Sequence, residues 1–326
     1  MIARVTSYLV CSALLGLALA GCGGSASSTT DAAPPTVPPA SSVGSTQSTE
    51  STTGDTTSIS TPTETQPETS AGVPTTTTGG GGSDPALAAA VAAYQAYVEK
   101  QSASLVTRTT AFSAALQHGD PRSAVHLYPN ARTLYERISP VANRVRDGLG
   151  TEMDALQGDV PASQWAGFHK IEKILFDTGT TVDTEKPGRA LVADAKELDS
   201  GVKGLQLDPG SIAAVAMALL DEASGAPLDG KEERWSRFDI NSLAANVAGI
   251  GAAWSALRPL VAARDPKLAA SVQNRYKDAH LTVESFKGLH GYRSYDELGP
   301  GEIAVIREKL GNLKPELEKI PPLLGA

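Results

Sequence analysis

The chain has 326 residues, 41% of them hydrophobic, and its 36 acidic residues outnumber 28 basic ones, for a formal net charge of −8. An acidic chain does not offer the positive surface that nucleic-acid binding needs, so we expect no nucleic-acid partner. Its two cysteines, Cys11 and Cys22, are too few for a disulfide framework.

The first 22 residues are typical of an export signal. Arg4 precedes an apolar run, residues 9–19, that is too short to span a membrane. The run ends in the stretch Leu-Ala-Gly-Cys, which resembles a bacterial lipobox. We therefore expect Cys22 to be lipidated and to anchor the mature chain to the cell membrane, outside the cytoplasm. An ordinary signal peptide with a chance cysteine is the alternative.

Residues 23–83 are dominated by Thr, Ser, Pro and Gly and contain no Lys or Arg. A segment of this composition cannot bury enough apolar surface to offset the entropy of ordering it. We expect a disordered tether here, followed by one folded domain over residues 84–326.

The folded part has helical periodicity throughout. Asp-Pro pairs that begin at residues 84, 120, 208 and 265 combine an N-cap with proline at the first helical position. Pro129 and Pro140 should break or kink the second helical segment, leaving residues 132–138 helical between them. A charged loop over residues 228–237 should lead into a long helix. We expect helices at about 84–117, 120–138, 151–156, 161–176, 187–205, 208–223, 238–264, 265–287 and 300–310.

Gly311 and Pro315 should interrupt the last helix, with a further short turn to about residue 320. Alternating Val and Ile runs are nearly absent, so we expect no sheet. The predicted fold is all-α, with two packed helical bundles preceded by the disordered tether.

The stretch GFHKIE places His169 three residues before Glu172. On a helix these two side chains share one face, and an imidazole with a carboxylate is half of a site for Fe, Mn, Cu or Zn. The alternative is a histidine hydrogen-bonded to its neighbouring glutamate. The pattern is not the zinc-peptidase signature, which needs two histidines four residues apart.

GFHKIEKILF resembles the G-x-H-x-x-E signature of the imelysin family, which includes iron-uptake lipoproteins of the EfeO and EfeM types. LYPNARTLYERISPVANRV, EERWSRFDINSLAANVAGI and GYRSYDEL resemble three further family segments, in the family's order, from Leu127 to Leu298. The tether stands where longer members carry a cupredoxin-like domain, so the chain is similar to the short form.

The resemblance implies an all-helical domain with a metal site in the cleft between two bundles. Its implied metal ligands are His169, Glu172, Glu136 and Asp239. Two of them have alternatives, because Glu136 could pair with Arg132 and Asp239 could cap the long helix. The chain also departs from the family pattern: Arg237 replaces a histidine, and Ser242 and Ser139 replace carboxylates. If the replaced side chains bind metal in other members of the family, this chain has fewer metal donors.

The resemblance further implies a lipid-anchored carrier that delivers iron, as Fe2+ or Fe3+, to a membrane permease, alongside a haem peroxidase of an Efe-type system. Cu2+ and Zn2+ are alternative metals, since ligand types alone do not fix the metal. We expect no enzymatic activity, because no distinctive residue stands out as the separate general base that a metallopeptidase requires. A metallopeptidase and a polysaccharide-binding module are the alternative functions.

Overall fold

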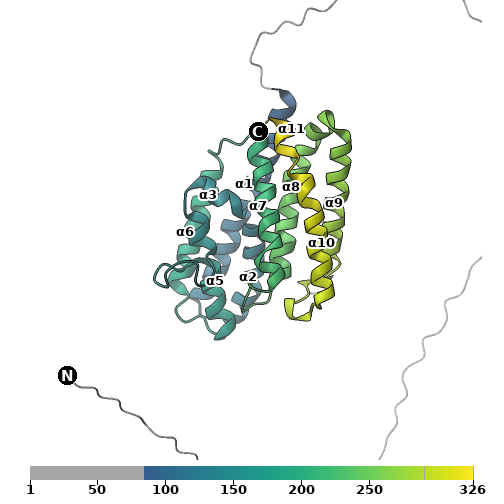
Figure 1. Ribbon diagram of the computed structural model, residues 1–326. Coiled ribbons are helices and arrows are strands. Elements are labelled where there is room, and N and C mark those ends of the chain that lie inside the picture. Colours follow the sequence, from purple (N-terminus) through teal and green to yellow (C-terminus); the bar gives the residue numbers. More distant parts are fainter. Residues whose placement is uncertain (1–83, 290, 326) are drawn as a thin grey trace, which may run out of the picture. The chain divides into compact units, whose positions relative to one another are not determined.

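The computed structural model describes residues 84–289 and 291–325. The expected export signal, the lipidation site at Cys22 and the tether over residues 23–83 lie outside these described residues. Within them the chain is mainly helical, as predicted (Figure 1). Its helices are α1 Pro85–Gln117, α2 Pro121–Glu136, α3 Ser139–Val145, α4 Leu149–Asp154, α5 Gly167–Glu172, α6 Glu185–Val202, α7 Pro209–Ser224, α8 Asp239–Arg264, α9 Pro266–Glu284, α10 Pro300–Leu317 and α11 Ile320–Leu324.

Four aspartates begin helices as their Asp-Pro sequences predict. Each is the N-cap residue, and its side chain accepts a hydrogen bond from a backbone N–H in the first helical turn. These aspartates are Asp84 for α1, Asp120 for α2, Asp208 for α7 and Asp265 for α9.

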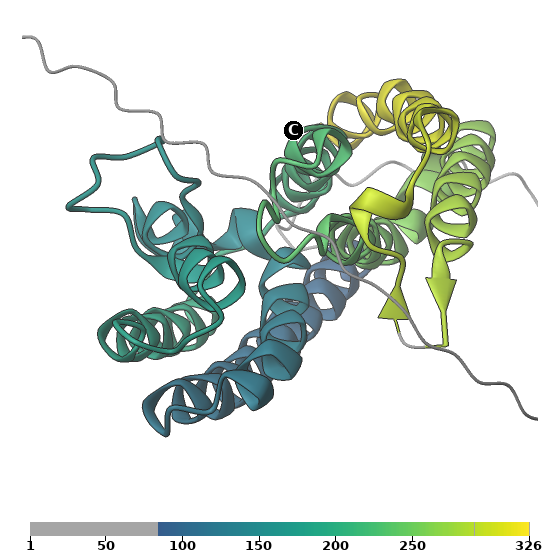
Figure 2. The same ribbon diagram turned by 90° about the horizontal axis from the view of Figure 1, so that it is seen from below.

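The helices form two packed groups around a continuous apolar core. One group contains α1, α2, α5 and α6, and the other contains α7, α8, α9 and α10 (Figures 1 and 2). Helix α8 packs against α1 and α2 and so joins the groups. Its small and apolar side chains are buried along most of its 26 residues, which suits a helix surrounded by others.

Three predicted interruptions do not occur. α2 continues through Pro129, and α10 continues through both Gly311 and Pro315. A proline removes one backbone hydrogen bond, and burial of neighbouring side chains outweighs that loss here. The buried neighbours are Tyr128, Ala131 and Arg132 in α2, and Leu310, Leu313 and Leu317 in α10.

Two further differences concern the predicted elements themselves. α5 begins at Gly167 rather than at Pro161, and its last turn widens into a π-helix, Lys173–Asp177. A minimal antiparallel pair, β1 Lys287–Gly288 and β2 Gly291–Tyr292, lies between α9 and α10, where no strand was expected. Two short 3-10 turns, Ala226–Asp229 and Tyr295–Glu297, lie in the loops.

Candidate metal centre

Gly167 sets the position of the histidine-bearing helix. Its φ of +74° lies in the left-handed region, and a Cβ atom at this position would lie 2.1 Å from the carbonyl oxygen of Met153. Only glycine lets the start of α5 approach the end of α4 this closely. The contact brings His169 next to Asp154, the last residue of α4.

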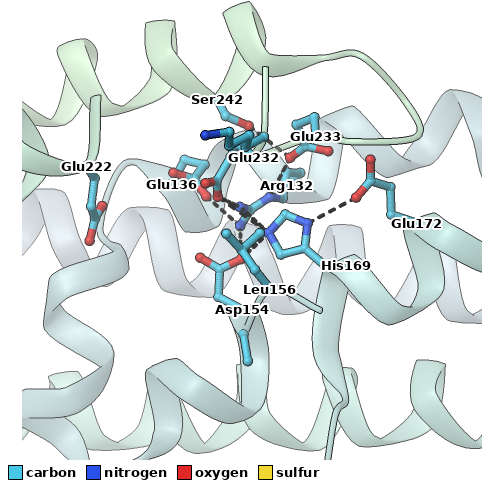
Figure 3. Close-up of polar contacts among 12 residues, drawn as sticks. Arg132, Glu136, Asp154, Leu156, His169, Glu172, Glu222, Glu232, Glu233 and Ser242 are labelled. Atoms are coloured by element: carbon cyan, nitrogen blue, oxygen red, sulfur yellow. Dashed lines mark hydrogen bonds and ion pairs between the residues drawn. The ribbon is translucent and has the colours of Figure 1, made fainter. Parts of the chain in front are cut away.

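His169 is fully buried, and both of its ring nitrogens meet carboxylates (Figure 3). Nδ1 lies 3.0 Å from Oε2 of Glu172. Nε2 lies 3.2 Å from Oδ1 of Asp154 and 3.4 Å from Oε1 of Glu232, which belongs to the loop before α8. The donor atoms of Asp154, His169 and Glu232 all lie within 4.8 Å of one another, so one imidazole and two carboxylates converge as a transition-metal site requires.

Burial and neighbouring charges shift the pKa values of His169 and Glu232 in opposite directions. Burial and the charge of Arg132 lower the pKa of His169, but contacts with Asp154, Glu172 and Glu232 outweigh them and raise it well above its usual value. Burial raises the pKa of Glu232, but His169 and Arg132 outweigh it and lower that pKa. A metal on Nε2 must therefore compete with a proton.

The Nε2 side of the ring borders an acidic pocket of about 430 Å³. Burial raises the pKa of Glu222 in this pocket to about 7, despite its bond from Ser139. Burial also raises the pKa of Glu136, against the effect of Arg132. The carboxylates that line the pocket are Glu136, Asp154, Asp159, Asp221, Glu222 and Glu232. Such a pocket attracts small cations and repels anions.

Arg132 is buried in the middle of the cluster (Figure 3). Its guanidinium forms four ion pairs, with N–O distances of 2.5 to 2.8 Å, to Glu136, Asp154, Glu232 and Glu233. These pairs offset part of the cost of burying so many carboxylates.

Glu172 links α5 to the loop before α8. Its Oε1 accepts hydrogen bonds from the backbone N–H groups of Trp235 and Ser236 and from the Ser236 hydroxyl, at 2.9 to 3.0 Å. Its Oε2 meets His169. Both oxygens are therefore engaged by the protein.

A second group of possible metal ligands lies on the Nδ1 side, formed by His169, Glu172 and Glu233. Both oxygens of Glu233 are also engaged: one accepts from Arg132 and Ser242, and the other accepts from Tyr128 and lies 2.9 Å from the Ser236 hydroxyl oxygen. This side is fully buried. The Nε2 side is thus the more accessible place for a cation.

The four ligands expected from the sequence are not all together. His169 and Glu172 are in contact, and Glu136 lies in the acidic pocket, 2.5 Å from Arg132. Asp239 belongs to neither group of possible metal ligands, and its Oδ1 accepts a hydrogen bond from the backbone N–H of Glu233 at 3.2 Å. Its Oδ2 has no hydrogen-bond partner among the described residues, and burial raises its pKa to about 7.

Sequence reasoning missed Asp154 and Glu232 as candidate donors. Glu232 opens the stretch EERWSRFD, which resembles a segment of the family, so the sequence does contain a signal for it. Asp154 lies in TEMDAL, where no motif marks it. Only the packing of α4 against α5 shows its place.

The departures from the family pattern have distinct structural roles. Arg237 points to Asp296, at 2.7 Å, and lies over the ring of Tyr295. Ser242 donates to Glu233 at 3.0 Å, and Ser139 donates to Glu222 at 2.6 Å. Each serine thus supplies a hydroxyl to a remaining carboxylate.

Comparisons with known proteins show the family of the chain. The family model described as Imelysin matches residues 90–300. The iron uptake system component EfeO of Yersinia pseudotuberculosis serotype I is 31% identical over 244 residues, which cover 74% of this chain and 65% of the relative. The protein of the same name from Escherichia coli O1:K1 is 30% identical over 243 residues, covering 73% and 64%. The chain therefore spans somewhat less than two thirds of the length of these relatives.

Proposed function

Because the chain belongs to the imelysin family, we propose that it is an extracytoplasmic lipoprotein that binds iron and delivers it to a membrane permease. The observation that carries this proposal is the convergence of Asp154 and Glu232 on Nε2 of His169, beside an acidic pocket. The names of the relatives, components of an iron uptake system, support the choice of metal.

We propose His169, Asp154 and Glu232 as the central metal ligands, with Glu136 reaching the same cation from the pocket. Glu172 orients the imidazole and Asp239 supports the loop behind Glu233. One imidazole among carboxylates suits Fe2+ and Fe3+, and also admits Cu2+ or Zn2+. The metal is cargo, so a site that borders a pocket suits its release.

The predicted lipid anchor at Cys22 and the predicted tether over residues 23–83 suit a carrier that must meet partners at the membrane. The permease and a haem peroxidase of an Efe-type system are its proposed partners. An acidic pocket does not suit an acidic polysaccharide. A metallopeptidase would need a metal-bound water and a general base, and the names of the relatives, components of an iron uptake system, support the carrier instead.

Calorimetric metal titrations of residues 23–326 test the proposal, with Fe2+ under anaerobic conditions, Fe3+-citrate, Cu2+ and Zn2+. We expect stoichiometric binding that is lost in His169→Ala and weakened at least about tenfold in Asp154→Asn and Glu232→Gln. Asp239→Asn should retain the affinity, because the asparagine oxygen can still accept the Glu233 N–H.

The control is Glu308→Gln on the exposed face of α10. Equal binding by the wild type and His169→Ala would contradict the proposed site. Loss of binding in Asp239→Asn would instead make Asp239 a ligand. Cleavage of a denatured protein substrate that depends on added metal would favour the peptidase.

A further inference from the structure

Arg132 supplies a guanidinium to the centre of the candidate metal site (Figure 3). Its side chain is 1% exposed, and it reaches the cluster from α2, the helix that also carries Glu136. Its guanidinium carbon lies 5.7 Å from the ring centre of Tyr135 and 5.3 Å from that of Phe168. These rings flank the guanidinium and help to hold it within the cluster.

The guanidinium touches the same three atoms that would bind the metal. Nη1 lies 2.6 Å from Oδ1 of Asp154, and Nη2 lies 2.7 Å from Oε1 of Glu232. Nη2 also lies 3.2 Å from Nε2 of His169. The three central donor atoms proposed for the metal therefore all lie within 3.2 Å of one buried cation.

A metal and the guanidinium cannot use these atoms together. A transition metal binds such donors at about 2.0–2.2 Å, whereas Nη1 and Nη2 already lie 2.6 and 2.7 Å from the carboxylate oxygens of Asp154 and Glu232. The two positive charges would also repel each other strongly in a buried site, where solvent screens them little.

We infer that Arg132 is a resident cation that neutralises the carboxylates before metal binds, and that it must release Asp154, Glu232 and His169 when metal is loaded. This inference rests on the proposed function. The ion pair from Nε to Glu233 remains available as a pivot for the released guanidinium. Arg132 thus stabilises the protein without metal and lowers its affinity for metal. The lower affinity also makes the metal easier to release.

The test compares residues 23–326 of the wild type with Arg132→Gln and Arg132→Lys, using Zn2+, which is diamagnetic and has no redox chemistry. The matched control is Arg146→Gln, which removes a surface arginine that pairs with Glu152 and Glu197. Circular dichroism establishes that each variant is folded.

We expect Arg132→Gln to bind Zn2+ at least about tenfold more tightly than the wild type. It should also melt at a lower temperature without metal and show a larger rise in melting temperature with saturating Zn2+. Arg132→Lys should lie between them, and the control should match the wild type. A folded Arg132→Gln variant with equal or weaker Zn2+ affinity overturns the inference.

Arginine side-chain 15N spectra of the wild type provide a second test if Arg132→Gln does not fold. Zn2+ should shift the Arg132 signal, which is assigned by its absence from Arg132→Lys. Zn2+ binding with an unchanged Arg132 signal would overturn the inference and leave the proposed function intact. If neither the wild type nor any folded variant binds metal, both are overturned, whereas binding only by Arg132→Gln supports the inference.

Discussion

The carboxylate of Glu172 holds the imidazole of His169 by Nδ1, at 3.0 Å, on the opposite side of the ring from the nitrogen that meets Asp154 and Glu232. A carboxylate in this position orients the ring and makes the other nitrogen a better donor. The i,i+3 pair in GFHKIE therefore has the geometry of a ligand with its supporting carboxylate.

Glu172→Gln should weaken Zn2+ binding by about 10- to 100-fold without abolishing it, because the ring loses its orienting charge but keeps Nε2. Calorimetry beside His169→Ala and the exposed control Glu308→Gln measures this. Complete loss of binding in Glu172→Gln, equal to that in His169→Ala, would show that Glu172 binds the metal itself.

Ser242→Asp restores the carboxylate that the family pattern has at this position. Ser242 is fully buried and donates to Glu233 at 3.0 Å, so an aspartate would place a second negative charge against that carboxylate. We expect the free energy of unfolding to fall by at least about 2 kcal/mol at neutral pH. Ser242→Ala, which only removes a hydrogen bond, should cost about 1 kcal/mol.

Urea unfolding of the two Ser242 variants makes the comparison. If Ser242→Asp is as stable as the wild type, the positive charge of Arg132 is enough to offset one more carboxylate in the cluster.

Asp194→Asn tests a titration outside the metal centre. Burial, with Glu152 and Glu197 nearby, raises the pKa of Asp194 from 3.8 to about 6. Between pH 3.8 and about 6 the folded state therefore keeps a proton on Asp194 that the unfolded state has lost. The stability that protonated Asp194 contributes is fully present below pH 3.8, and this contribution is lost as the pH rises through about 6. Above that pH the variant should be more stable than the wild type by about 1 kcal/mol, after allowance for partial exposure.

Thermal melts of both proteins at a series of pH values measure the Asp194 effect, with the exposed Asp278→Asn as control. The melting temperatures of the two proteins should converge as the pH falls toward 3.8, the usual pKa of the side chain. A difference that stays constant with pH would mean that the substitution acts through packing instead of ionisation.

Gly167→Ala should disrupt the approach of α5 to α4. The new Cβ would lie 2.1 Å from the carbonyl oxygen of Met153, in addition to the strain of a φ of +74°. We expect a loss of at least about 3 kcal/mol in unfolding free energy, and weaker Zn2+ binding because His169 moves from Asp154.

Gly179→Ala is the matched control, since its φ is +69° and a Cβ there meets no atom within 4 Å. It should cost only about 1 kcal/mol, the strain of the backbone conformation alone. Equal losses for the two glycines would show that contact with Met153 is not what requires glycine at position 167.

The helices were predictable because their signals are local. An Asp-Pro start needs only the residues of one turn, and α1, α7, α8 and α9 lie close to where the sequence placed them. Pro129 and Pro315 were misjudged because burial of the helix face around each proline, which the sequence does not show, outweighs one lost hydrogen bond.

By itself the sequence determined the all-helical fold, the family resemblance and the pairing of His169 with Glu172, because helix geometry fixes which residues three apart share a face. Tertiary structure alone decided that Asp154 and Glu232 meet Nε2, that Asp239 stands apart and that Arg132 lies among the carboxylates. Those contacts join α2, α4, α5 and the loop before α8. Their distances depend on how the elements pack, which no local spacing encodes.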